Sequence, residues 1–407
     1  MAENRILFLA PASIPVNVAE AIVNVKLLKL LVSKGYKIDL ISKKAKWEHY
    51  PLTQEEELQH SLESVTVIEL DNKISFKTAW LHLRAWIRFG VVFKGVHWAF
   101  VASKVASGLI KKNRYSCVIT KNYPSELAGY WLKRKYALPW VATWNDPYPH
   151  ERFPEPYGKG PDCVLPLFKR PIIKLMSLYP DAHIFPSARL RDYMQGYLKA
   201  KAETLYVVPH IVESSGQPRV NTDDGVLKIC YMGNLDGPRQ PWTMIEAIKC
   251  FVEDNKHVPF KVDFIGTAPQ TAESVVSREG LSEYIRFFRP VSYNESLKLL
   301  LQYDVTLIIE APCQEGIFLP SKVSDAMAAG IVMFAVSPSA GVLNDLFKNG
   351  IIGYFADVTN PESIKSELER LVGDFSKGAL YNTAIPVDYT PKAVGDMYDM
   401  IISNVSV

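Results

Sequence analysis

Two short segments in the second half of the sequence carry residue types that could bind a charged ligand. The first is Ile229–Trp242, where an apolar run ends at Gly233 and leads into a loop with a single arginine, Arg239. A guanidinium at the end of a strand and beside the start of a helix suits a diphosphate. A solvated loop arginine would leave the same pattern, so this segment alone permits both interpretations.

The second segment places a cation and a carboxylate three residues apart. Lys322 and Asp325 follow Pro320, which fits the start of a helix, and precede Gly330, which fits its end. Residues at this spacing share one helical face, so a lysine for phosphate and an aspartate for a ribose diol could act together. For this segment taken alone, an intrahelical ion pair, worth roughly 0.3–0.5 kcal/mol, is the favoured explanation of the spacing.

Several familiar catalytic and ligand-binding motifs are missing from the sequence. It contains no GxGxxG after the first strand, no Walker A motif and no HExxH, and its five cysteines form no CxxC pair. These absences argue against a dehydrogenase, a P-loop enzyme, a zinc hydrolase and a disulfide framework. We therefore expect no metal and no cofactor, and a reducing compartment.

Alternating strands and helices must position the two segments. Short apolar runs such as Ile6–Ala10, typical of strands buried on both faces, alternate with helical patterns throughout the chain. This βαβ rhythm predicts an α/β fold with doubly wound parallel sheets. The length of 407 residues favours two domains.

The expected domain boundaries follow from a change in composition near the middle. Residues 213–224 are polar, rich in turn formers and read as a linker, after which the βαβ series restarts. We expect an N-terminal domain over 1–212 and a C-terminal domain over 225–387. A final helical segment over 388–407 could pack back on the N-terminal domain.

Taken together, the two segments resemble the retaining group 1 glycosyltransferases of the GT-B fold. Gly233, Arg239, Lys322, Asp325 and Gly330 match that family's donor-binding segments in kind and order. The resemblance implies two Rossmann-like domains facing a central cleft. It also implies transfer of a sugar from a nucleotide-diphosphate sugar to an acceptor with retention of anomeric configuration, without a metal.

The resemblance also assigns roles to individual residues. Arg239 and Lys322 would be catalytic, because they stabilise the departing diphosphate, and Asp325 would bind the ribose. Gly233 and Asn234 would contribute to donor binding. Many family members carry two glutamates separated by seven residues, an interval that here leads to Ile317 instead; Glu315 nearby is a second catalytic candidate near the sugar.

In the N-terminal half the family often has His-Asp after a strand, whereas this sequence has Asn145-Asp146. Both are candidates for binding the acceptor or the sugar, although Asn-Asp-Pro is also a good turn sequence. Asn17, in the first βα loop, is a further candidate, in a loop without the family's usual glycine pair. The loop Lys121–Glu126 is a weaker acceptor-side candidate.

A basic, aromatic stretch runs from Lys73 to Arg114 and contains no acidic residue. Cations with interfacial aromatic residues on a helix indicate binding in the plane of an anionic membrane. The predicted membrane patch consists of Lys77, Trp80, Arg84, Trp86 and Arg88. Core aromatics with a solvated basic rim are the alternative. We expect no nucleic-acid partner, because no binding motif accompanies the patch and the net charge is only +3.

These observations predict a cytoplasmic glycosyltransferase, peripheral on the inner face of the cytoplasmic membrane. Its acceptor would be a lipid-linked saccharide or another oligosaccharide, in cell-surface polysaccharide or glycan assembly. Two alternatives stay open: a nucleotide-sugar epimerase of the same fold, and a non-catalytic subunit that binds nucleotide or a partner protein.

Overall fold

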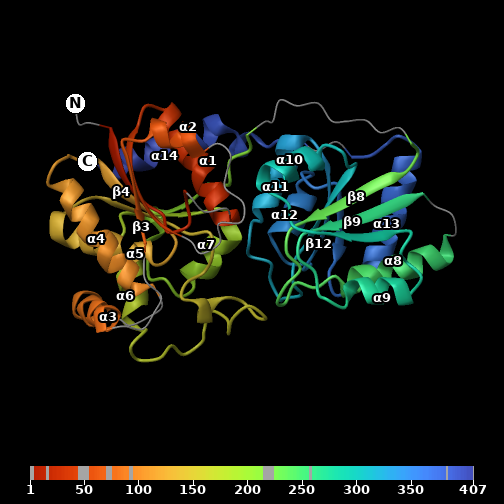
Figure 1. Ribbon diagram of the computed structural model, residues 1–407, viewed down its shortest axis with the longest axis horizontal. Coiled ribbons are helices and arrows are strands. Elements are labelled where there is room, and N and C mark those ends of the chain that lie inside the picture. The colour runs from red at the N-terminus through yellow and green to blue at the C-terminus, as the bar shows by residue number, and fades with distance from the viewer. Residues whose placement is uncertain are drawn as a thin grey trace. The chain divides into compact units, whose positions relative to one another are not determined.

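The computed structural model describes residues 4–14, 18–44, 55–69, 76–90, 95–213, 224–255, 259–381 and 384–406. The chain divides into two compact units, which we call unit 1 and unit 2 (Figure 1). Unit 1 comprises Met1–Phe153, Gly158–Ile211 and Thr390–Val407, and unit 2 comprises Pro154–Tyr157 and Val212–Tyr389. The short segment 154–157 therefore belongs to unit 2, although it lies far from the rest of that unit in the sequence. Residues 214–223 of the expected linker lie outside the described residues.

Unit 1 is built on a seven-stranded sheet in the order β3-β2-β1-β4-β5-β6-β7, with every neighbouring pair parallel. The strands are β1 (Arg5–Leu9), β2 (Lys37–Lys43), β3 (Ser64–Ile68), β4 (Cys117–Lys121), β5 (Trp140–Thr143), β6 (Ala182–Phe185) and β7 (Leu205–Val207). The central strands are buried on both faces, which explains why their sequences are continuous apolar runs.

Helices cover the unit 1 sheet. They are α1 (Ala19–Ser33), α2 (Glu55–Ser61), α3 (Phe76–Phe89), α4 (Val96–Ile110), α5 (Ser125–Tyr136), α6 (Pro171–Leu178), α7 (Ala188–Gln195) and α14 (Pro391–Val405). The last of them, α14, packs against α1 and β5. Lys34 at the end of α1 forms ion pairs with Asp396 and Asp399 of α14, at 3.1 and 2.8 Å. The end of the chain is thereby fixed in unit 1.

Unit 2 is built on a six-stranded parallel sheet in the order β10-β9-β8-β11-β12-β13. Its strands are β8 (Leu227–Met232), β9 (Phe260–Ile265), β10 (Ile285–Phe288), β11 (Val305–Ile309), β12 (Val332–Ser337) and β13 (Tyr354–Asp357). Its helices are α8 (Trp242–Asp254), α9 (Ala272–Arg278), α10 (Tyr293–Leu300), α11 (Ser321–Ala329), α12 (Val342–Lys348) and α13 (Pro361–Ser376). The strand order changes direction between β8 and β11, which is where ligands bind in sheets of this kind.

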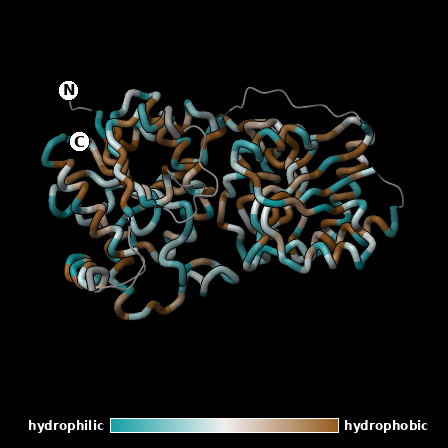
Figure 2. Tube along the Cα trace, viewed as in Figure 1, coloured by the Kyte–Doolittle hydropathy of each residue, from teal (hydrophilic) through white to brown (hydrophobic). Residues whose placement is uncertain are grey.

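The core of unit 2 lies on both faces of its sheet. One cluster of buried side chains joins alternate residues of β8, β9, β11 and β12 to α8 and α13, and a second joins the opposite faces of β11 and β12 to α11 and α12. Figure 2 shows hydrophobic segments along the strands inside each unit. The predicted α/β class with two parallel sheets is confirmed. None of the described helices is both long enough and apolar enough to cross a membrane.

Candidate functional site

Two glycine turns lie side by side at the carboxyl ends of β8 and β9. Gly233 and Gly266 have φ values of +141° and +147°, a backbone region that side-chain-bearing residues rarely adopt. A Cβ on Gly266 would lie 1.9 Å from the carbonyl oxygen of Gly233, and a Cβ on Gly233 would lie 2.4 Å from Nζ of Lys322. Glycine at 233 therefore lets the Lys322 ammonium reach the backbone at the end of β8.

The Lys322 side chain comes from the first turn of α11 and lies over the ring of Tyr231, with Nζ 4.2 Å from the ring centroid. Burial and the nearby Arg239 together lower the pKa of Lys322 to about 7, against the opposing effect of Asp236 and Asp325. The ammonium has thus lost much of its hydration. A bound anion would stabilise its charged form.

Arg239 reaches the same place from the loop between β8 and α8. Burial by itself would lower the pKa of Arg239, but Tyr231, Tyr157 and Glu310 together raise it above its ordinary value. Among the described residues, its buried Nε has no hydrogen-bond partner. Since buried donors are normally paired, this N–H is available to a ligand acceptor. The structure thus brings together Gly233, Arg239 and Lys322, as the sequence led us to expect.

Two residues of this site were missed by the sequence analysis. Tyr157, in the segment 154–157, contacts Phe318 at 5.6 Å between ring centroids and interacts with Arg239. Glu310 follows β11 directly, is 5% exposed and accepts a hydrogen bond from the Ser337 hydroxyl. Burial raises the pKa of Glu310 to about 7, although Ser337 and Arg239 act in the opposite direction. An acidic residue immediately after an apolar strand was the signal that could have identified Glu310.

The other candidates of unit 2 lie nearby in the sequence but have different surroundings. The Asp325 carboxylate accepts a hydrogen bond from the hydroxyl of Tyr293, on α10, at 2.8 Å. Asn234 has an exposed side chain, and its carbonyl oxygen accepts a hydrogen bond from Tyr231 at 3.0 Å. Glu315 is partly buried in the loop after β11, where its carbonyl oxygen accepts a hydrogen bond from the Cys313 thiol at 3.3 Å. The Tyr293 hydroxyl thus orients the Asp325 carboxylate.

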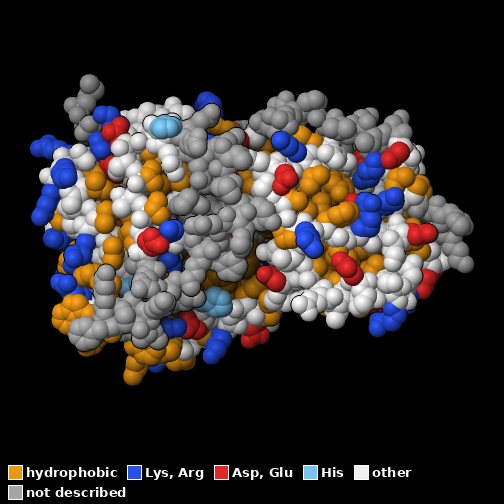
Figure 3. All heavy atoms as spheres, in the orientation of Figure 1, with side chains coloured by type: hydrophobic (Ala, Val, Ile, Leu, Met, Phe, Trp, Pro, Cys, Tyr) orange, Lys and Arg blue, Asp and Glu red, His pale blue; other side chains and the backbone are white. Residues whose placement is uncertain are grey.

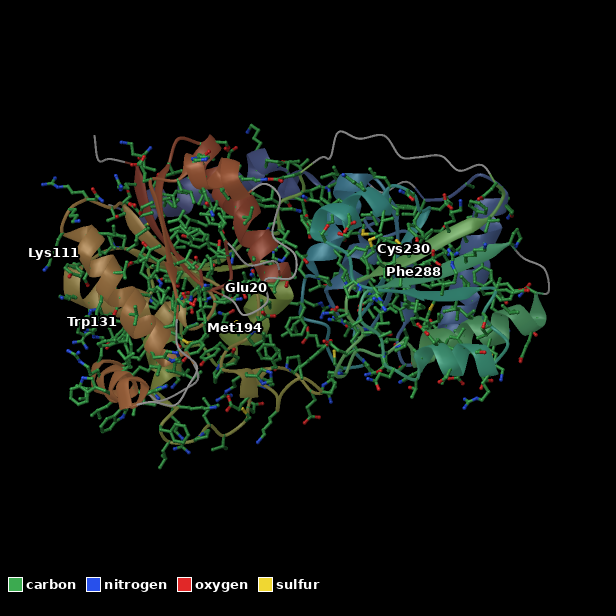
Figure 4. All side chains as sticks on the ribbon, viewed as in Figure 1. Glu20, Lys111, Trp131, Met194, Cys230 and Phe288 are labelled. Atoms are coloured by element: carbon green, nitrogen blue, oxygen red, sulfur yellow. The ribbon has the colours of Figure 1, made fainter. Side chains whose placement is uncertain are left out.

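In unit 1, the candidates lie at the carboxyl ends of β4 and β5. The backbone N–H of Asn145 donates to Oδ1 of Asn122 at 2.8 Å, which orders the turn that carries Asp146. Burial raises the pKa of Asp146 to about 6. Glu20, at the start of α1 (labelled in Figure 4), has its pKa raised to about 8 by burial and by Asp146. Asn17, the remaining candidate of this unit, lies outside the described residues.

Lys121 interacts with carboxylates of unit 1 and also lines a small pocket. Burial lowers the pKa of Lys121 to about 8, while Glu20 and Glu126 oppose that shift. A pocket of about 20 Å³, room for one water-sized group, is lined by Lys121, Asn145 and His210 among others. A group of buried and partly buried polar side chains thus lies at the carboxyl ends of β4 and β5 in unit 1. It includes Asn145, Asp146, Glu20 and Lys121.

The predicted membrane patch is placed on α3, with one correction. Trp80, Arg84 and Trp86 are exposed, while the side chain of Lys77 lies outside the description. Arg88 is turned inward: it donates to the Ser103 hydroxyl at 2.7 Å and lies 4.2 Å from the Phe100 ring centroid. Arg88 therefore joins α3 to α4 and is no surface cation. No group of three or more metal-ligating side chains occurs in the part of the chain that the structure describes.

Comparison with known proteins finds a family match in the second half of the chain and similar folds over the whole chain. Residues 215–378 match the sequence model of the group 1 glycosyl transferases. The whole chain resembles a glycosyltransferase from Rickettsia africae, with 14% identity, 98% of each chain covered and a TM-score of 0.66. It also resembles HepE from Anabaena, solved with UDP and glucose, with 12% identity, 99% of this chain and 98% of that chain covered, and a TM-score of 0.63.

A third similar structure is S. aureus TarM, solved with UDP, fondaparinux and α-GlcNAc-glycerol, with 11% identity, 98% of this chain and 99% of that chain covered, and a TM-score of 0.64. The chain matches no curated protein in sequence. The resemblance to the group 1 glycosyltransferases is confirmed over residues 215–378, and the α/β fold with two parallel sheets is confirmed over the whole chain.

Proposed function

We propose that this chain, a group 1 glycosyltransferase by its residues 215–378, moves a sugar from a nucleotide-diphosphate sugar to a lipid-linked saccharide or other oligosaccharide acceptor with retention. The observation that carries this proposal is the convergence of Lys322 and Arg239 on Tyr231 at the carboxyl end of β8. Ligands bind at this end of the strands in open α/β sheets. Two cations close together in a partly desolvated place suit a diphosphate.

The chemistry that these cations would supply is stabilisation of the leaving group. Negative charge grows on the diphosphate as the bond to the sugar breaks, and fixed positive groups lower the barrier most when water is excluded. Arg239 can donate from its unpartnered Nε, and Lys322 regains a favourable partner for its ammonium. We propose that these side chains neutralise the diphosphate in the role that a metal ion has in other transferases.

Glu310 and Asp325 would have supporting roles in the same site. Glu310 lies near Arg239 and is held by Ser337, so we propose that it positions the guanidinium. Asp325 is oriented by Tyr293 and would accept hydrogen bonds from the ribose hydroxyls. Loss of Asp325 should therefore raise the KM for donor more than it lowers kcat. Glu315 remains a candidate near the sugar.

We assign the acceptor side to unit 1. Asn145, Asp146 and Lys121 offer hydrogen-bond donors and acceptors at one end of its sheet, as recognition of sugar hydroxyls requires. The solved complexes of HepE contain UDP or UDP-glucose, which makes UDP the first nucleotide to test here. A role in surface polysaccharide or glycan assembly is consistent with this choice of donor and acceptor.

The proposal is tested by the release of UDP from a panel of UDP-sugars, with and without a lipid extract of the expression host as the source of acceptors. We expect release that depends on one donor and increases with the extract, and a loss of at least about tenfold in kcat for Arg239→Gln. Arg278→Gln is the matched control, because Arg278 is 72% exposed on α9 of the same unit. NMR of the product's anomeric proton reports retention.

Three results would contradict the proposal. Full activity of Arg239→Gln at saturating donor would mean that the diphosphate binds elsewhere. Conversion of a UDP-sugar to its epimer with no acceptor present would identify an epimerase. UDP binding by calorimetry without turnover of any donor would identify a non-catalytic nucleotide-binding subunit.

A further inference from the structure

Helix α3 exposes an apolar stripe to solvent. Trp80, Leu83 and Ile87 are 52%, 41% and 71% exposed, and their spacing of three and four residues places them on one face of the helix. Trp86 beside them is 50% exposed. The opposite face of α3 packs on α4, through buried residues such as Ala85. A surface helix normally turns its apolar stripe toward the core. The second, exposed stripe of α3 therefore indicates a surface that binds a partner.

A second exposed apolar segment precedes α6 and includes its end. Val164, Leu167 and Phe168 are 83%, 76% and 53% exposed, and Leu178 is 56% exposed. Both segments border α5: Arg88 of α3 lies 4.4 Å from the ring centroid of Trp131 on α5, and α6 packs on the same helix. Figure 3 shows hydrophobic side chains gathered at the end of unit 1 where α3 lies.

We call these side chains of α3 and of residues 164–178 the α3–α6 surface. Exposed apolar residues are common singly, but a contiguous group of large ones marks a site of interaction. Tryptophan and phenylalanine beside leucine and isoleucine are the residues that enter the boundary between lipid headgroups and acyl chains. The composition of this surface therefore matches a membrane interface.

The charges around the α3–α6 surface are predominantly positive. Helices α3, α4 and α6 contain no acidic residue, and their vicinity exposes Arg84, Lys104, Lys111, Lys112, Arg170 and Lys174. Figure 4 places Lys111 and Trp131 on the same side of unit 1. Of the acids that flank α6 in the sequence, Glu151 is paired with Lys169 and Asp181 with Lys133. Asp162, two residues before Val164, is the exposed acid at this border. Each surface cation near an anionic leaflet contributes about 1 kcal/mol to membrane binding.

We infer that the α3–α6 surface docks unit 1 on an anionic lipid membrane, with the apolar side chains inserted at the headgroup level and the cations on the phosphates. An apolar centre with six exposed cations and one exposed acid at its border complements an anionic lipid surface better than it complements a second copy of itself, because two such cationic borders would repel each other. The inference rests on the surface alone and requires no transferase activity.

The test is sedimentation of the full chain with vesicles of phosphatidylcholine, with and without phosphatidylglycerol. We expect strong binding to the anionic vesicles only, weakened by salt. Trp80→Ser with Ile87→Ser should reduce binding by at least about tenfold, as should Leu167→Ser with Phe168→Ser. Arg84→Gln with Lys174→Gln should reduce it by about thirtyfold.

The matched control is Phe288→Ser with Val387→Ser, which removes two exposed apolar side chains from unit 2 and should leave vesicle binding unchanged. All of these positions are exposed, so thermal melting should show folded variants. Absence of binding to anionic vesicles, or equal losses in the control, would overturn the inference. A dimer in sedimentation velocity that Trp80→Ser with Ile87→Ser dissociates would also overturn it, in favour of self-association. Because the vesicle assay contains no donor, its failure would leave the donor-site proposal untouched.

Discussion

Substitution of Gly233 by alanine tests the donor site through its geometry. A Cβ at this position would lie 2.4 Å from Nζ and 2.8 Å from Cε of Lys322. These atoms belong to the end of a flexible side chain. We therefore expect the Lys322 side chain to change its conformation and the backbone to keep its own. The change thus removes the ammonium from its position over Tyr231 without altering its charge.

The substitution changes both the free energy of folding and the free energy of UDP binding. Alanine at a φ of +141° costs on the order of 1–3 kcal/mol of folding free energy. Loss of the charge-assisted hydrogen bonds of Lys322 to a diphosphate would cost about 1.5–3 kcal/mol of binding free energy. The second term corresponds to a roughly 10- to 100-fold increase in the Kd for UDP.

Isothermal titration of UDP into the folded variant measures the loss of binding free energy. Thermal melting without ligand measures the loss of stability. Gly237→Ala is the control, because Gly237 lies in the same loop at a positive φ of +54° but has no atom within 4 Å of an added Cβ. It should lose stability and keep its affinity for UDP. If folded Gly233→Ala bound UDP as tightly as the wild type, Lys322 over Gly233 would not be a diphosphate contact.

Three further predictions follow from single groups. Lys322→Met should raise the melting temperature of the ligand-free protein, because burial has lowered the pKa of Lys322 to about 7, yet weaken UDP binding by at least about tenfold in titration calorimetry. Glu310→Gln should flatten the pH dependence of the free energy of unfolding. Burial raises the pKa of Glu310 from its ordinary value of 4.5 to about 7, so the wild type loses on the order of 2–3 kcal/mol of stability as the pH rises through that window. Urea unfolding at about pH 5 and about pH 7.5 measures this loss in both proteins. An equal slope in the variant would contradict the burial of a protonated Glu310. Asn360→Ala should cost about 1 kcal/mol in urea unfolding with UDP affinity unchanged, because the Asn360 side chain accepts from the Glu362 and Ser363 N–H groups at the start of α13.

Local signals were sufficient for the parts of the site that lie within one strand–loop–helix segment. The apolar run before Gly233 predicted β8, and Pro320 with Gly330 predicted the helix that became α11 (Ser321–Ala329). The meeting of Arg239 with Lys322 follows from the neighbouring positions of β8 and β11 in the sheet, an arrangement that parallel βαβ folds impose. For this reason the family resemblance could place both cations in one site.

Long-range packing decided what the sequence could not reveal. Tyr157 reaches Arg239 because residues 154–157 join unit 2, and no periodicity marks such an excursion. Arg88 was expected on the surface from its helical spacing with Arg84. The spacing cannot tell which face of α3 packs against its neighbours. In the structure, the rings of Phe100 on α4 and Trp131 on α5 lie against the Arg88 guanidinium and offset part of the cost of burying its charge.

The central claim is that Arg239 and Lys322 hold the donor's diphosphate at the carboxyl end of β8. The most direct test is a crystal structure of the protein with UDP. We expect diphosphate oxygens within hydrogen-bonding distance of the Arg239 guanidinium and of Lys322 Nζ, beside the backbone of Gly233. A diphosphate bound instead beside Lys121 in unit 1, or at any place remote from both cations, would contradict it.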